Sequence, residues 1–182
     1  NVNVNVENKI GILKSYTLFK KALINLGWTT SWYHKKLLNT RELYLNKPFE
    51  LIIPSDAVNA ENIPIEIVAL NPDEYKIFAE VPPQNQDPNN VFEINETVKF
   101  GEPFVNEYFN FTLEQGSGTT GESYYLVFNN LNTLTNYYLK KTKISGDEAG
   151  SNLITISIVG STIEKEADFI NELNNVFIQF GV

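Results

Sequence analysis

The chain has one histidine, His34, between Tyr33 and Lys35 in a polar stretch. A Ser-His-Asp arrangement or a multi-histidine metal site is therefore either built on His34 or absent. We interpret His34 as a surface residue, which is the commonest setting of a lone histidine. Cysteine is absent, which removes disulfides, zinc-thiolate sites and thiol nucleophiles together. We predict no catalytic, metal-binding or cofactor-binding residue.

Carboxylates and glycines offer two further kinds of chemistry. The neighbouring pairs Asp73–Glu74 and Asp147–Glu148 are typical of solvated turns, whereas a glycosidase needs carboxylates that face each other across a cleft. A hydrolase is therefore our third hypothesis only.

The glycine-rich stretch 115–122 could cradle phosphate, but Glu122 follows its last glycine where a lysine is expected. We interpret the stretch as a mobile hairpin connection.

Aromatic residues of the second half could form a surface on which sugar rings stack. The candidates for facing a glycan are Tyr124, Tyr125 and Tyr137. The other interpretation, which we favour, is that these rings fill the core and its rim.

Composition indicates a folded protein and limits its partners. The 182 residues are 42% hydrophobic and 13% aromatic, which is ordinary for one sizeable core or two small lobes. The net charge of -8 argues against binding nucleic acid or an anionic membrane through bulk charge, although local basic patches remain open. No stretch is apolar enough to span a membrane. Methionine is absent, so we expect Asn1 not to be the native start.

The N-terminal part predicts either the tail of an incoming strand or the remnant of a linker, followed by a long helix. Residues 1–6 alternate Asn and Val, the period of a strand. From Val6 the apolar residues recur at helical spacing, and Gly27 is placed to end a helix of about twenty residues in a left-handed cap. Gly11 weakens this helix, so a close packing partner would explain it.

The middle of the chain is rich in β-branched and aromatic residues between prolines, which is typical of strands. A strand-rich sub-lobe at 48–113 follows from this pattern. We predict strands at 28–36, 48–54, 63–70, 75–81, 91–100, 108–113, 123–128 and 142–145, a short helical turn or edge at 40–44, and a helix at 131–141.

The C-terminal stretch 152–182 predicts a buried strand, a turn and a helix in succession. Residues 153–159 are mostly β-branched, and Ser161 with Glu164 has the spacing of a capping box. One helical face should lie on a sheet and the other should be solvated. The first face consists of Ile163, Ala167, Ile170, Leu173, Phe177 and Phe180. We expect an α+β fold with helices at both ends packed on a mixed sheet, in a single domain over 1–182.

Two separated segments resemble the extracytoplasmic domain of chain-length determinant proteins, the Wzz-type polysaccharide co-polymerases. The resemblance is closest to the Bacteroidetes branch fused to a cytoplasmic tyrosine autokinase. The first segment is Glu7–Ser15 with Trp32–Tyr33, Thr40–Tyr44 and Pro48–Phe49, and the second is Asn152–Ser157 with Glu164–Leu173. Together they cover about half the chain in the order found in that family.

The resemblance implies a non-catalytic scaffold on the periplasmic face of the bacterial inner membrane. Such proteins are anchored by spans on both sides of this segment, assemble as homo-oligomeric rings and set the length of surface polysaccharide made by a partner polymerase. Candidate contacts between subunits are Lys9, Lys14 and Glu164. A kinase domain would lie elsewhere in the parent protein, and the ragged C-terminus would continue into a helical arm. The alternative is a secreted carbohydrate-binding or adhesin-like module.

Overall fold

The computed structural model describes residues 2–83, 90–147 and 152–181, and the chain divides into two compact units. Residues 30–129 form one unit, which we call the sheet unit. Residues 1–29 and 130–182 form the other, which we call the helical unit. The expected strand-rich lobe at 48–113 lies inside the sheet unit, which also includes the strands before and after it.

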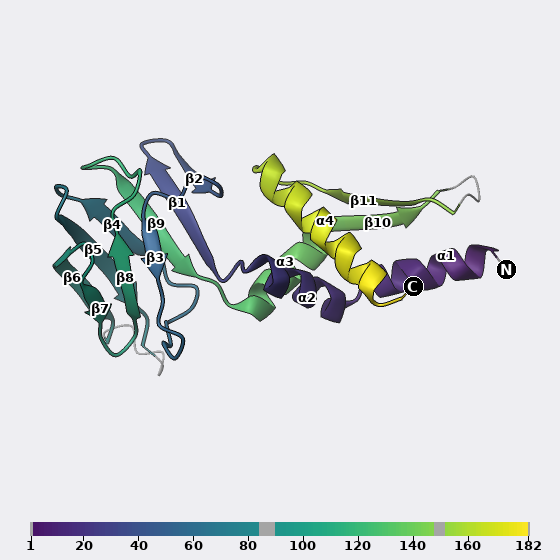
Figure 1. Ribbon diagram of the computed structural model, residues 1–182, viewed down its shortest axis with the longest axis horizontal. Coiled ribbons are helices and arrows are strands. Elements are labelled where there is room, and N and C mark those ends of the chain that lie inside the picture. Colours follow the sequence, from purple (N-terminus) through teal and green to yellow (C-terminus); the bar gives the residue numbers. More distant parts are fainter. Residues whose placement is uncertain (1, 84–89, 148–151, 182) are drawn as a thin grey trace. The chain divides into compact units, whose positions relative to one another are not determined.

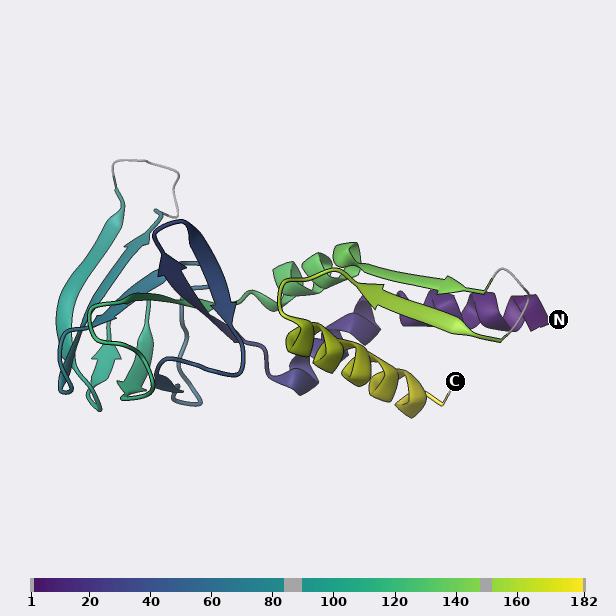
Figure 2. The ribbon, with the colours of Figure 1, turned by 90° about the horizontal axis from the view of Figure 1, so that it is seen from above.

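The sheet unit consists of two antiparallel sheets (Figures 1 and 2). The larger sheet has the strand order β2-β1-β9-β4-β5-β6 and the smaller one β3-β8-β7. The strands are β1 (Thr30–Lys36), β2 (Asn39–Leu43), β3 (Glu50–Ile52), β4 (Ile65–Ala69), β5 (Glu74–Val81), β6 (Phe92–Lys99), β7 (Pro103–Val105), β8 (Asn110–Glu114) and β9 (Ser123–Phe128).

The core of the sheet unit lies between the sheets because side chains alternate along each strand. In β9, for example, Tyr124, Leu126 and Phe128 are buried, whereas the residues between them are half-buried on the other face. The buried cluster draws on both sheets, with Trp32 and Ile67 from the larger and Phe111 from the smaller. Every residue of that cluster belongs to the sheet unit.

The glycine-rich loop between β8 and β9 is fastened to the sheet unit. The amide of Gly118 donates to the carbonyl of Pro48 at 2.8 Å, and that of Gly121 to Ala69 at 2.9 Å. A Cβ on Gly116 would lie 2.9 Å from the Cα of Phe49, closer than side chains approach a backbone. These glycines allow a close backbone approach, which the sequence-based interpretation as a mobile connection did not include.

The helical unit contains α1 (Val2–Leu13), α2 (Tyr16–Leu26), α3 (Leu131–Lys141) and α4 (Ile163–Gln179), with the antiparallel hairpin β10 (Thr142–Gly146) and β11 (Ile154–Ile158). A strand over residues 1–6 is wrong for the described residues, which begin α1 instead. Tertiary packing outweighs the alternating pattern here, because Val6 and Ile10 lie against Gly146 of β10. The long helix is also divided, since the hydroxyl of Ser15 caps α2. Gly27 ends α2 at φ 67°, as predicted.

Aromatic packing forms the core of the helical unit. The ring of Phe169 lies 4.4 Å from Tyr138 and 5.4 Å from Phe19, and Trp28 lies 5.6 Å from Tyr138, measured between centroids. Beside these rings Lys141 and Glu166 form a largely buried ion pair, and the Lys141 ammonium also lies over the Tyr138 ring.

Three predictions for the C-terminal stretch are wrong. The N-cap of α4 is Thr162, without a side-chain cap bond, so Ser161 and Glu164 do not form a capping box. The buried residues of α4 are Lys165, Glu166, Phe169, Leu173 and Val176, so the face that packs is rotated from the expected one and shares only Leu173 with it. Strand β11 is half-buried rather than buried, because it belongs to a two-stranded hairpin.

The α+β fold class is confirmed. The helices at the two ends of the chain pack around an antiparallel hairpin, and all strand pairs of the described residues are antiparallel. The predicted helix at 131–141 is α3, and the predicted 40–44 segment is the edge strand β2. Of the Asp147–Glu148 pair expected in a solvated turn, Glu148 lies outside the described residues.

Candidate functional site

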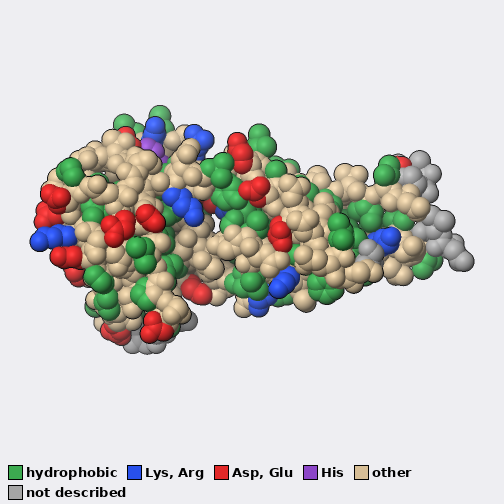
Figure 3. All heavy atoms as spheres, in the orientation of Figure 1, with side chains coloured by type: hydrophobic (Ala, Val, Ile, Leu, Met, Phe, Trp, Pro, Cys, Tyr) green, Lys and Arg blue, Asp and Glu red, His purple; other side chains and the backbone are tan. Residues whose placement is uncertain are grey.

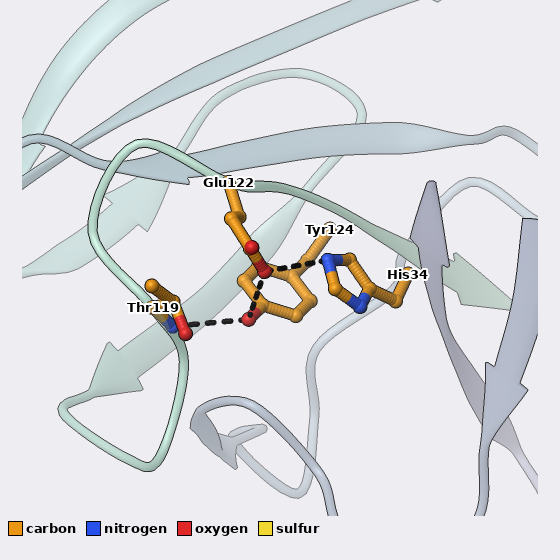
Figure 4. A network of polar contacts seen from close by, with 4 residues as sticks. All are labelled: His34, Thr119, Glu122 and Tyr124. Atoms are coloured by element: carbon orange, nitrogen blue, oxygen red, sulfur yellow. Dashed lines mark hydrogen bonds and ion pairs between the residues drawn. The ribbon is translucent and has the colours of Figure 1, made fainter. Parts of the chain in front are cut away.

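A polar network joins the only histidine to the glycine-rich loop (Figure 4). The Nε2 atom of His34 on β1 lies 2.7 Å from a carboxylate oxygen of Glu122. The imidazole stacks on the ring of Tyr124 at 4.7 Å between centroids, and the Tyr124 hydroxyl donates to Glu122 at 3.4 Å. The same hydroxyl accepts from the amide of Thr119 at 3.0 Å. His34 is thus a half-buried residue with fixed partners, not the free surface residue we expected.

The network contains one of the two parts that a nucleophilic site needs, a carboxylate paired with an imidazole. A carboxylate that orients an imidazole is the supporting pair of many general bases, but it needs a nucleophile within reach of the second ring nitrogen. The hydroxyl of Ser123, the residue after Glu122, donates to Glu66 at 2.6 Å instead. Among the described residues no group of three or more His, Asp or Glu is placed to hold a metal ion. What the network does in this structure is hold the loop against β1.

A row of large side chains crosses the face of the larger sheet that points away from the core. Tyr33 pairs with Tyr125, Tyr125 with Glu66, Glu66 with Phe78, and Phe78 with Asn95. Because adjacent strands are about 4.8 Å apart, the backbone positions of Tyr125 and Phe78 are about 10 Å apart along the row, with that of Glu66 between them. We call these five residues the outer row.

Two open depressions accompany the outer row. One is lined by Glu66, Val68, Lys76 and Phe78. The other is lined by His34, Lys35, Lys36, Leu37, Glu66, Gly121, Glu122 and Ser123. Glu66 lines both, and the Lys35 ammonium lies 5.7 Å from the centroid of the Tyr125 ring. Aromatic faces beside hydrogen-bonding and charged groups make this side of the sheet the best candidate binding surface of the sheet unit.

The predicted aromatic set is only partly brought together. Tyr125 belongs to the outer row, but Tyr124 is 5% exposed and points into the core, so its prediction as a glycan-facing residue is wrong. Strand alternation separates these neighbours onto opposite faces. Tyr137 is exposed on α3, in the other unit. Tyr33 and Phe78 were missed because the sequence does not give the strand order that aligns them.

The predicted subunit-contact residues all lie in the helical unit. Lys9 is half-buried on α1, Lys14 is exposed directly after α1, and Glu164 is exposed in the first turn of α4. Close to Glu164, α4 carries a second apolar stripe that is not the one it buries. Ile163 is 79% exposed, Ala167 is exposed, and Ile170 and Phe177 are half-buried. These four residues, which we call the outer stripe, recur at helical spacing.

No family model matches the chain, and no curated protein matches it. Among solved structures, the crystal structure of Xanthomonas campestris FlgL is similar over 81% of this chain and 41% of its own, at 12% sequence identity and a TM-score of 0.27. A TM-score this low does not establish a shared fold. None of the described helices is long and apolar enough to cross a membrane.

Proposed function

We propose that this chain is a non-catalytic scaffold domain of a membrane-anchored polysaccharide co-polymerase. In this proposal it lies on the periplasmic face of the bacterial inner membrane, is anchored by spans outside residues 1–182, and assembles as a homo-oligomeric ring. The ring works with the polymerase and export machinery to regulate the chain length of surface polysaccharide. The support from sequence is the resemblance to that family of two separated segments. They are 7–15 with 32–33, 40–44 and 48–49, and 152–157 with 164–173.

The observation that carries the proposal is the outer stripe of α4. A helix of a small unit normally buries one apolar face, and α4 does so with Phe169, Leu173 and Val176. Its outer stripe leaves a second set of apolar side chains in contact with water, which is unfavourable unless another surface covers it. In a ring of subunits, a neighbouring copy of the chain covers this stripe.

Charged residues of the helical unit fit the same role. Glu164 lies in the first turn of α4, next to Ile163 of the outer stripe. Lys9 lies on α1 of the same unit, and Lys14 directly follows α1. Opposite charges at the rim of an apolar interface fix its register more than its strength. The helical unit therefore offers an apolar centre with charges of both signs.

The test is a change of charge on the outer stripe in the complete gene product. We expect Ile163→Lys with Ile170→Lys to disrupt the oligomer, measured by cross-linking in membranes, and to alter the length distribution of the surface polysaccharide. Val58→Lys is the matched control, because Val58 is an apolar side chain that is 85% exposed on the sheet unit. An unchanged oligomer and polymer length in the double variant would refute the role of the stripe.

The gene around this segment gives a separate test of the anchoring. The proposal expects apolar spans of about twenty residues on both sides. A signal peptide with no downstream span would instead favour a secreted module.

The outer row supports a second candidate function, binding of carbohydrate. Tyr33, Tyr125 and Phe78 present aromatic rings, which stack on the apolar faces of pyranoses, and Glu66 and Asn95 can bond to hydroxyl groups. On a glycan array we expect Tyr125→Ala to abolish binding and Tyr137→Ala, on the helical unit, to leave it unchanged. Equal binding by both variants would exclude the outer row.

A further inference from the structure

The tip of the β1–β2 hairpin carries the two most exposed large apolar side chains of the described residues. Leu37 and Leu38 have relative exposures of 105% and 100%. They form the turn between β1 and β2, where Lys36 pairs with Asn39 (Figure 1). Both leucines therefore project from the end of a ribbon into solvent.

Neither the turn nor the core explains these leucines. Two-residue hairpin turns favour Asn-Gly and similar pairs, because the common turn types need positive φ angles. Asn62 is the only described non-glycine residue with positive φ, so Leu37 and Leu38 form a different turn that many polar residues would suit. The first residue of the hairpin beyond the tip that packs on the core is Leu43.

The residues that flank the tip along the hairpin are basic, against the overall charge of the protein, although Glu66 and Glu122 line the same depression as Lys35 and Lys36. Lys35 and Lys36 precede the leucines and Arg41 follows them, and all three are exposed. Residues 34–41 contain no acidic residue in a chain whose net charge is -8. The strand register places Arg41 opposite His34 and Thr40 opposite Lys35, so the cations flank the leucines on both strands. Figure 3 shows green apolar and blue basic side chains together at the top of the sheet unit, where Figure 1 places this hairpin.

We propose that the β1–β2 tip docks on a lipid bilayer that contains anionic headgroups. Leu37 and Leu38 enter the boundary between headgroups and acyl chains, while Lys35, Lys36 and Arg41 stay at the level of the phosphates. Apolar side chains ringed by cations are the general pattern of peripheral membrane attachment. A convex tip suits a fluid surface, which needs no preformed pocket. The inference does not depend on the scaffold role proposed above.

Two other partners fit the tip less well. A nucleic acid would contact the cations but leave the leucines in water. The tip also has no aromatic ring on which a base could stack. A protein groove would accept the leucines but has no need of cations on both strands. The overall negative charge opposes approach to an anionic bilayer, but salt screens charges farther than about 8 Å from the surface. The contact is therefore restricted to the tip.

The test is flotation of the protein with vesicles of phosphatidylcholine alone or mixed with phosphatidylglycerol. We expect binding to the mixed vesicles that weakens as salt is added. Leu37→Ser with Leu38→Ser should lower the partition coefficient at least about tenfold, because the transfer of two leucines is lost. Lys35→Gln with Lys36→Gln should lower it several-fold, and Val58→Ser, at an exposed valine of the same unit, should leave it unchanged.

A second readout locates the tip in the bilayer. The native tryptophans, Trp28 and Trp32, are buried, so Leu38→Trp adds a distinct exposed fluorophore. Its emission should shift to the blue with mixed vesicles and be quenched by lipids brominated along the acyl chain. Absence of vesicle binding by the native protein, or equal binding by the double-serine variant, overturns the proposal. Self-association that is lost in the double-serine variant, without vesicle binding, also overturns it and assigns the tip to a protein contact.

Discussion

The hydroxyl of Tyr75 is a buried polar group in the core of the sheet unit. Tyr75 is fully buried, its ring lies 5.0 Å from that of Phe100, and its hydroxyl has no hydrogen-bond partner among the described residues. Burial raises the pKa of the phenol above its usual value of about 10, because the charged form is poorly solvated there. The side chain contributes its ring to the core, while its hydroxyl is a cost.

We predict that Tyr75→Phe is neutral or stabilising near neutral pH, by up to about 1 kcal/mol in the free energy of unfolding. Above about pH 10 the unfolded state loses the phenol proton while the folded state keeps it, so the native protein loses stability as pH rises. The advantage of the variant should grow there by up to about 1.4 kcal/mol per pH unit. Urea unfolding at several pH values measures this, with Tyr137→Phe as the exposed control. A clear loss of stability in Tyr75→Phe at neutral pH would mean that the hydroxyl is satisfied.

Among the elements, α1 contains a glycine that its packing does not require. A Cβ on Gly11 would meet nothing within 4 Å, and its φ is not positive. The close partner expected from the sequence is therefore absent among the described residues. The loop between β8 and β9 is the opposite case, because Gly116 lies against the backbone of Pro48 and Phe49.

We predict that Gly11→Ala stabilises the helical unit by about 0.5–1 kcal/mol, since alanine loses less backbone entropy in a helix. Gly116→Ala should destabilise the sheet unit by more than that, because the backbone must shift. Trp28 reports on the helical unit and Trp32 on the sheet unit, so urea midpoints from variants with one tryptophan separate the two effects. A loss of stability in Gly11→Ala would indicate that another surface packs on α1 at this point.

Element types could largely be predicted from the sequence, whereas their faces could not. Alternation and turn residues gave most strands of the sheet unit, because those signals are local. The prediction of the buried face of α4 was wrong because that helix has two apolar stripes. Only the contacts of Phe169 with Phe19 and Tyr138 determine which stripe is buried. The outer row and the pair of His34 with Glu122 form because β1, β9 and β4 are neighbours in the sheet, although these strands are distant in sequence. Strand order of this kind has no local signal.

At the scale of the whole molecule, the sheet unit is a continuous segment inserted into a discontinuous one. Residues 30–129 are preceded and followed by parts of the helical unit. Thr30 pairs with Phe128 across β1 and β9, so the two ends of the inserted segment lie about 5 Å apart. Insertions with adjacent ends leave the host chain's path almost unchanged.

We predict that residues 30–129 fold alone, because the buried cluster of the sheet unit takes no residue from outside it. The remaining chain should fold when Thr29 is joined to Asn130 through a short Gly/Ser linker, since its own aromatic core around Phe169 is complete. Each product should show cooperative thermal unfolding by circular dichroism, with the fluorescence of Trp32 or Trp28 following the same transition. In the intact protein these two tryptophans should then report separable transitions. Failure of the isolated 30–129 chain to fold, with a single coincident transition in the intact protein, would show that the two units depend on each other for stability.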